Sequence, residues 1–149
     1  MLTLVLARSM VPLSRADLFE LLSDKNTHAH KLAKLVDVKV CKHLGHAREF
    51  TLILKAFAQK CMWEHALSTL PVIRECGVEP NAINYNAAIN ACSKGKQWEH
   101  ALAMLAEMIE CSLEADVISF NAVVSACERG EQWEWALRIL TTMRAYAIQ

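Results

Sequence analysis

Cysteine and histidine are the residues of this chain with the most versatile chemistry, because both bind metal ions and cysteine is also a nucleophile. The 149-residue sequence contains six of each. The densest cluster is Cys41-x-His43-x-x-His46, with His28 and His30 upstream. Its spacing matches no standard zinc pattern, and the sequence has no Cys-x-x-Cys pair. We therefore expect no metal ion and no other cofactor.

Nucleophilic and basic side chains form no recognisable catalytic set. No ordered Ser, His and Asp arrangement stands out, and with four glycines in total there is no Gly-rich phosphate loop. We expect no catalytic residue, and the sequence predicts that the protein is not an enzyme.

The composition favours a compact helical domain. Hydrophobic residues make up 54% of the chain, which has only four glycines and three prolines. This excludes a collagen-like chain, a Gly/Pro-rich disordered chain and a turn-rich β-sandwich. No apolar run approaches the roughly 18 residues of a membrane-spanning helix, so no membrane partner is expected. Basic and acidic residues both total 16, so the net charge is zero. A general nucleic-acid binder is expected to carry a net positive charge, which this sequence does not have.

A repeat with a period of 35 residues dominates the sequence. Trp63, Trp98 and Trp133 follow this period, and each opens a Trp-Glu-x-Ala-Leu block. Cys76 and Cys111 are separated by the same interval, so they mark a repeated structural position rather than a disulfide set. The repeat divides the chain into units at 47–81, 82–116 and 117–149, the last of which stops two residues short of a full unit.

Each unit is expected to form two helices. In the second unit the apolar spacing predicts helices at about 83–93 and 97–110, and in the third at 117–128 and 132–146. Asp116 is a good N-cap for the helix that follows it. A single helical hairpin cannot bury its apolar face alone, so the units are predicted to stack into an all-α, right-handed α-solenoid.

Several residues of the second helices are expected to control packing. The repeated tryptophan and methionine positions are predicted to be core, and Ala66, Ala101 and Ala136 to sit where two helices approach closely. Pro71 interrupts the pattern of the first unit, and it is expected to kink or shorten its helix.

Residues 1–46 do not match the repeat. Segment 1–16 contains arginine and serine but no acidic residue, which is typical of an organelle transit segment, although ordinary chain is the alternative. The rest is expected to form a degenerate hairpin that caps the first unit. We therefore expect an organellar location, chloroplast or mitochondrion, with the cytoplasm as the alternative. The incomplete third unit suggests a fragment of a longer array, or a protomer that stacks end to end.

The repeat resembles that of the pentatricopeptide repeat family. The resemblance rests on Ile83-Asn84-Tyr85-Asn86, on Gly95, on the block from Trp98 to Leu102, and on Met108. Val117-Ile118-Ser119-Phe120-Asn121 repeats the opening of the unit. The resemblance covers residues 47–149. The nearest competitor is the tetratricopeptide repeat, a protein-binding solenoid with a period of 34 residues.

The resemblance implies binding of single-stranded RNA, with one base recognised by each unit. In this family the fifth residue of a unit and the last residue before the next unit contact the base. The implied pairs are Thr51 with Asn81 and Asn86 with Asp116, while Asn121 lacks its partner. In the family's pattern these correspond to adenine, uracil and a pyrimidine, so the implied target is 5′-A-U-pyrimidine-3′.

The resemblance also assigns residues that contact base faces and phosphates. The second residue of each unit packs against bases in this family, which implies that role for Arg48, Ile83 and Ile118. Lys94 and Arg129 match a basic position that faces phosphates, where the first unit has Gln59.

Two alternatives remain at the level of sequence. Asn81 and Asp116 are also explained as plain N-caps, whereas Asn86 and Asn121 occupy a first helical turn, where asparagine has poor propensity. The competing function is a protein-interaction solenoid without RNA binding, whose surfaces contact other subunits or a second copy.

Overall fold

A computed structural model describes residues 47–147, which form six α-helices and no strand. The helices are α5 (Ala47–Gln59), α6 (Trp63–Glu75), α7 (Ala82–Lys94), α8 (Trp98–Glu110), α9 (Val117–Arg129) and α10 (Trp133–Ala147). Equivalent helices begin 35 residues apart, so the period of the sequence is also that of the structure. The transit-like segment 1–16, the expected N-terminal hairpin and the cluster around Cys41 lie outside the described residues.

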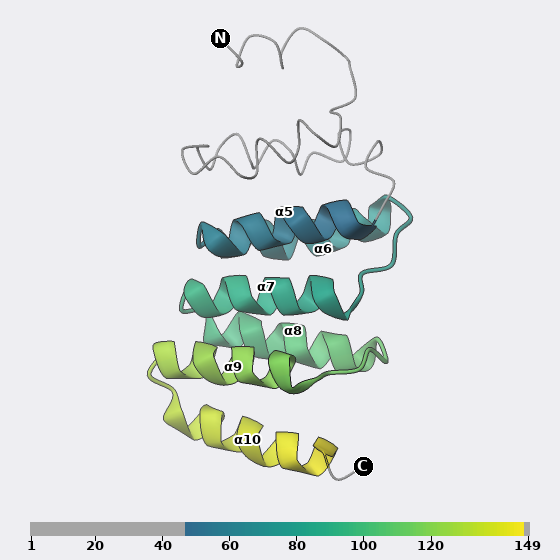
Figure 1. The fold of residues 1–149 in the computed structure, drawn as a ribbon. Helices are drawn as coiled ribbons and strands as arrows, with labels where there is room; N and C mark the ends of the chain where they lie inside the picture. Colours follow the sequence, from purple (N-terminus) through teal and green to yellow (C-terminus); the bar gives the residue numbers. More distant parts are fainter. Residues whose placement is uncertain (1–46, 148–149) are drawn as a thin grey trace, which may run out of the picture.

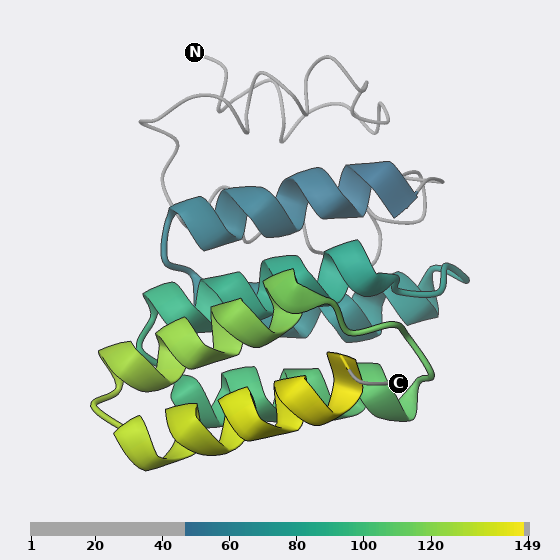
Figure 2. The ribbon, with the colours of Figure 1, turned by 60° about the horizontal axis from the view of Figure 1, so that its bottom comes forward.

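The helices form two layers (Figure 1). In one layer α7 packs between α5 and α9, and each of these three helices also packs against the helix that follows it. In addition, α6 contacts α7 and α8 contacts α9, so each second helix also touches the next unit. Figure 2 shows the stacked order from a second direction. The described residues are therefore an all-α helical repeat solenoid, as the sequence predicts.

The core between the layers runs from unit to unit. One cluster of buried side chains is centred on Phe50, Phe57 and Tyr85, and the next on Ile89 and Phe120. The partly buried side chains of Trp63 and Met104 pack against both clusters. Because neighbouring units share these contacts, no unit buries its apolar face by itself.

Tryptophan meets glycine at both boundaries between described units. A Cβ atom on Gly95 would lie 2.5 Å from Cδ1 of Trp63, and one on Gly130 would lie 2.6 Å from Cδ1 of Trp98. Gly95 has a φ of −78°, so it is needed for space and not for backbone conformation. The left-handed residue of that turn is Lys96, with a φ of 58°. The glycines thus allow the indole of one unit to pack against the turn of the next.

A second ring contact reinforces each of these boundaries. The ring centroid of His100 lies 5.0 Å from that of Trp63, and Trp135 lies 6.0 Å from Trp98 in the equivalent place. Histidine and tryptophan therefore exchange at one packing position, which requires bulk rather than a metal ligand.

Pro71 was predicted to kink or shorten its helix, and the shortening is wrong, because α6 has 13 residues, as α8 does. The proline is exposed, while Leu70 and Ile73 beside it are buried in the core. Tertiary packing before and after the proline holds the helix although one backbone hydrogen bond is lost.

The prediction of a core role is confirmed for most of the repeated positions and wrong for Trp133. Ala66, Ala101 and Met108 have no exposed surface, whereas Trp133 is 67% exposed. Within the described residues no following unit supplies a glycine turn to cover its indole, which explains the difference. Across residues 47–147, no helix combines the length and the hydrophobicity that crossing a membrane requires.

Candidate nucleic-acid interface

The predicted recognition residues recur at the N-terminal ends of α5, α7 and α9. Thr51, Asn86 and Asn121 each occupy the fifth position of their helix, and Asn81 and Asp116 are the N-caps of α7 and α9. Because α7 packs against both α5 and α9, equivalent positions follow one another along the same edge of this layer (Figure 1).

Asn81 begins α7 through a reciprocal pair of hydrogen bonds. Its Oδ1 accepts from the backbone N–H of Asn84 at 3.0 Å, and Oδ1 of Asn84 accepts from the backbone N–H of Asn81 at 3.0 Å. This capping box satisfies donors that the first turn would otherwise leave unpaired. The interpretation of Asn81 as an N-cap is confirmed.

Asp116 caps α9 and remains exposed to solvent. Its Oδ1 accepts from the backbone N–H of Ser119 at 2.9 Å. This backbone hydrogen bond is the main reason that the pKa of Asp116 lies below its ordinary value, and partial desolvation opposes it. The carboxylate is therefore ionised at neutral pH and presents a charged acceptor at the surface.

Ser119 joins the two residues that the resemblance pairs in the second unit. Its Oγ lies 2.6 Å from Oδ1 of Asn86 and 2.9 Å from Oδ1 of Asp116. The side chains of Asn86 and Asp116 also approach each other directly, with 3.5 Å between Nδ2 and Oδ1. The structure thus brings this pair together at the boundary between two units, although the residues belong to different helical hairpins.

Asn84 makes the equivalent connection at the preceding boundary. Its Nδ2 donates to Oγ1 of Thr51 at 3.0 Å, while its Oδ1 contacts the backbone of Asn81. Sequence reasoning missed both Asn84 and Ser119, which are fully buried polar residues at the third position of their units. The available signal was a polar residue recurring after 35 residues between apolar neighbours.

Two exposed isoleucines flank the polar positions. Ile83 is 56% exposed and Ile118 is 66% exposed, each three residues before an asparagine of the same helix. Residues three apart lie on one helix face, so Ile83 lies beside Asn86 and Ile118 beside Asn121. The first unit has the exposed Arg48 at this position.

Basic side chains lie further along the same helices. Lys94 and Arg129 occupy the last turns of α7 and α9, eight residues after Asn86 and Asn121. In α5 the exposed Lys55 follows Thr51 by one turn, a cation that sequence reasoning did not single out. Each of the three helices therefore carries a cation on the C-terminal side of its recognition position.

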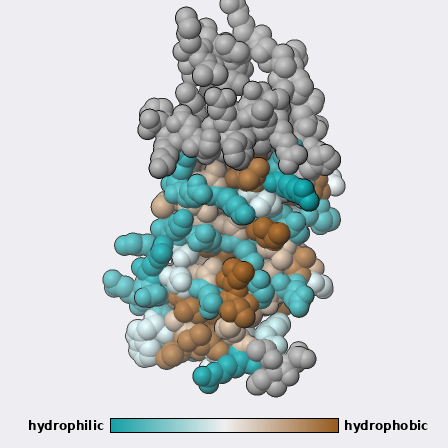
Figure 3. Space-filling model, viewed as in Figure 1, coloured by the Kyte–Doolittle hydropathy of each residue, from teal (hydrophilic) through white to brown (hydrophobic). Residues whose placement is uncertain are grey.

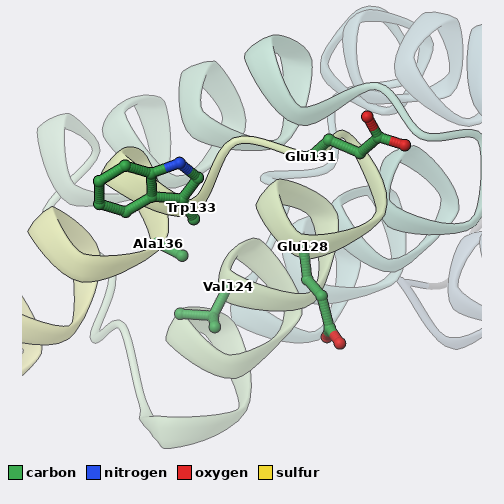
Figure 4. A pocket seen from close by; sticks show the side chains of 5 residues that line it. All are labelled: Val124, Glu128, Glu131, Trp133 and Ala136. Atoms are coloured by element: carbon green, nitrogen blue, oxygen red, sulfur yellow. The ribbon is translucent and has the colours of Figure 1, made fainter.

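A separate apolar surface lies at the α9–α10 end. The space-filling view shows apolar residues gathered over this end of the molecule (Figure 3). A pocket of about 400 Å³ lies between α9 and α10 (Figure 4). It is lined by Val124, Glu128, Glu131, Trp133 and Ala136, so it includes none of the predicted recognition residues.

Another polar network lies elsewhere and connects three helices through the buried Tyr85 and the more exposed Arg74 and Glu107. The Tyr85 hydroxyl donates to Glu107 at 3.0 Å and accepts from Arg74 at 2.6 Å, while Arg74 and Glu107 form an ion pair at 2.8 Å. Burial is the main cause that raises the pKa of Tyr85 far above its ordinary value. The network links α6, α7 and α8 and fixes the first two units against each other. Among residues 47–147, no three metal-ligating side chains converge.

Three family models match the chain, and all of them describe one kind of repeat. The model of the pentatricopeptide repeat domain matches residues 46–95, that of the PPR repeat family matches 80–129, and that of the PPR repeat matches 118–146. The matches overlap, so together they extend without a gap over residues 46–146, more than half of the chain. A comparison with curated proteins gave no significant match.

Proposed function

The chain belongs to the pentatricopeptide repeat family, and on this premise we propose that it binds single-stranded RNA in a sequence-selective manner, one base to each unit. The bases contact the N-terminal ends of α5, α7 and α9, and the strand runs across the three units. The protein acts as a binding scaffold that marks, shields or remodels a transcript, without catalysing a reaction.

The observation that carries the proposal is the pairing of Asn86 with Asp116. The two side chains are 3.5 Å apart and together offer an amide donor beside an ionised acceptor. Uracil has the matching edge, because its imino N–H lies between two carbonyl oxygens. Asp116 accepts from the imino group while the Asn86 amide donates to a carbonyl, which agrees with the base implied by the family's pattern.

The other two units extend this assignment. Thr51 and Asn81 correspond to adenine and Asn121 to a pyrimidine, so the proposed target is 5′-A-U-pyrimidine-3′. Ile83 and Ile118, both exposed beside their asparagines, supply apolar surface for the base faces, and Arg48 supplies a guanidinium plane. We assign the neutralisation of phosphates to Lys94 and Arg129, which occupy the last turns of α7 and α9.

The affinity of three units is expected to be modest. Base contacts contribute roughly 1–3 kcal/mol each, and association costs on the order of 4 kcal/mol or more. A high protein concentration is therefore needed to measure binding. When one unit has bound its base, the linkage raises the effective concentration of the next base at the next unit, and the affinity of the array increases. We further propose that the target is an organellar transcript, in a chloroplast or mitochondrion.

The test is fluorescence anisotropy with nine-nucleotide RNAs that differ only in the central triplet. The 5′-A-U-U triplet is expected to bind more tightly than 5′-G-C-G, and Asn86→Ala to reduce the affinity for the first RNA. Equal binding of both triplets by the unmodified protein contradicts the proposal. Arg138→Gln, a substitution on α10, is the control that is expected to leave both affinities unchanged.

The second candidate function, a protein-interaction solenoid, is favoured by the exposed apolar side chains of α10. Trp133, Leu137 and Leu140 are 67%, 55% and 41% exposed. This surface is distinct from the recognition positions, so the two functions separate experimentally. The double substitution Leu137→Lys and Leu140→Lys is expected to leave RNA affinity unchanged and to abolish contact with other subunits or a second copy. Sedimentation velocity measures that contact.

A further inference from the structure

We infer that Ser119 is a positioning residue for the base recognised by the preceding unit, and that its hydroxyl sets which edge of the Asn86 amide faces the RNA. This inference rests on the proposed function. It assigns part of the specificity of each unit to the third residue of the next unit, which lies behind the residues that contact the base.

The distances determine the direction of the hydrogen bond between Ser119 and Asn86. The two oxygens are 2.6 Å apart, a separation typical of O–H···O hydrogen bonds and short for N–H···O. A reversed amide would place its oxygen 3.5 Å from Oδ1 of Asp116, where two acceptors repel each other. The single proton of the Ser119 hydroxyl faces two acceptors, Oδ1 of Asn86 at 2.6 Å and Oδ1 of Asp116 at 2.9 Å, and it favours the shorter contact. Ser119 therefore donates mainly to Oδ1 of Asn86, and the Asn86 amide faces Asp116 with its NH₂ group.

This direction determines what Asn86 offers to a base. Its oxygen is engaged by Ser119, and its NH₂ group has a second N–H beyond the one directed at Asp116. Asn86 is thus held as a donor beside the carboxylate acceptor. Without the hydroxyl, the amide rotates and offers either a donor or an acceptor, so pairing with more than one base becomes possible.

Burial keeps the Ser119 hydroxyl in this role. The residue has no exposed surface, and besides Asn86 its Oγ contacts only Oδ1 of Asp116 at 2.9 Å and the Met108 sulfur, a weak acceptor, at 3.8 Å among the described residues. The backbone N–H of Ser119 separately donates to Asp116 and starts α9. Removing the hydroxyl therefore leaves the helix cap in place, which separates a structural role of Ser119 from a positioning role.

The first boundary supplies an independent instance with a different side chain. Asn84, 35 residues before Ser119, donates from Nδ2 to Oγ1 of Thr51 at 3.0 Å. Its own orientation is fixed, because its Oδ1 accepts from the backbone of Asn81. At both boundaries the third residue thus donates to the oxygen of the fifth residue of the preceding unit, whether the donor is a hydroxyl or an amide.

The experiment measures base discrimination at each nucleotide separately. RNAs with 5′-A-U-U, 5′-A-C-U and 5′-G-U-U at the centre are titrated into the unmodified protein and into Ser119→Ala, Ser119→Thr and Asn84→Ala. Ser119→Ala is expected to reduce the preference for uracil over cytosine at the second nucleotide about fivefold and to leave the first nucleotide unaffected. Ser119→Thr keeps the hydroxyl and the preference, and Asn84→Ala loses discrimination at the first nucleotide alone.

The outcomes separate this inference from the proposed function. If the unmodified protein does not discriminate at the second nucleotide, the proposed function fails and the inference with it. If it discriminates and Ser119→Ala retains the ratio within twofold, only the inference is overturned. If Ser119→Ala proves too unstable to measure, Asn84→Ala decides. Loss of base discrimination at the first nucleotide alone supports the inference, and equal loss of discrimination at both nucleotides overturns it.

Discussion

Asn86 and Asp116 lie 30 residues apart, near opposite ends of the second unit, yet their side chains approach to 3.5 Å and both contact the hydroxyl of Ser119 in the third unit. The approach follows from the stacking of α7 against α9, which sets the first turn of one helix beside the cap of the other. A recognition position is therefore a property of a boundary between units. An isolated unit contains only part of it.

Asp116→Asn separates helix capping from base recognition. Asparagine caps a helix as well as aspartate does, so the free energy of unfolding is expected to change little. The ionised acceptor is lost, and an amide that also donates replaces it. Hydrogen bonds to charged groups are stronger than neutral ones by about 1 kcal/mol, so the preference for uracil over cytosine is expected to fall about fivefold. Thermal unfolding and anisotropy together check both parts, and a fall in stability with unchanged base preference would support capping alone.

Lys94→Gln and Arg129→Gln test the phosphate contacts. Each substitution is expected to make the slope of log K against log salt concentration shallower by about 0.7. It is also expected to lower the affinity for all RNAs equally, because phosphate contacts carry no sequence information. Titrations at several salt concentrations measure this slope. Arg138→Gln is the charge-matched control, since that guanidinium lies 5.1 Å from the ring centroid of Trp135 on α10. A slope that changes as much for Arg138→Gln would refute the assignment.

Gly130→Ala tests the packing of tryptophan on glycine between units. The added Cβ would lie 2.6 Å from Cδ1 of Trp98, so overpacking is expected to destabilise the protein by about 1–3 kcal/mol. Combining it with Trp98→Leu, which makes room, is expected to remove most of the additional loss. Urea unfolding of the four proteins in this cycle gives the coupling energy. Additive effects of the two substitutions on the free energy of unfolding would show that Gly130 and Trp98 are not energetically coupled.

Much of this fold was predictable from sequence because the signals were local and repeated. The expected helix at 83–93 is observed as Ala82–Lys94, since apolar spacing and the glycine turn mark both ends. The bond from Asn84 to Thr51 was not predictable, because it joins residues 33 apart and depends on how two helices pack. The exposure of Trp133 was not predicted. The sequence repeat identifies its position in the unit, whereas the burial of its side chain depends on contacts with a neighbouring unit.

Cys92 should make stability depend on pH in the alkaline range. Burial raises the pKa of the Cys92 thiol to about 11 from an ordinary value near 9. Because the folded state favours the neutral thiol, this contribution to stability is complete below pH 9 and is lost as the pH rises to about 11. Cys92→Ala is expected to flatten this part of the profile of melting temperature against pH. The exposed Cys61, replaced by alanine, is the control, and an equal flattening there would contradict the assignment.

The central claim is that RNA binds at the boundaries between units, and the side-chain amide of Asn86 reports on it most directly. We would record ¹⁵N–¹H spectra of the protein during titration with an RNA containing 5′-A-U-U. The account predicts that the Asn86 side-chain amide and the backbone signals of Ser119 and Asn121 shift with RNA concentration, while those of α10 do not. Shifts confined to α10, or none near Asn86, would contradict it.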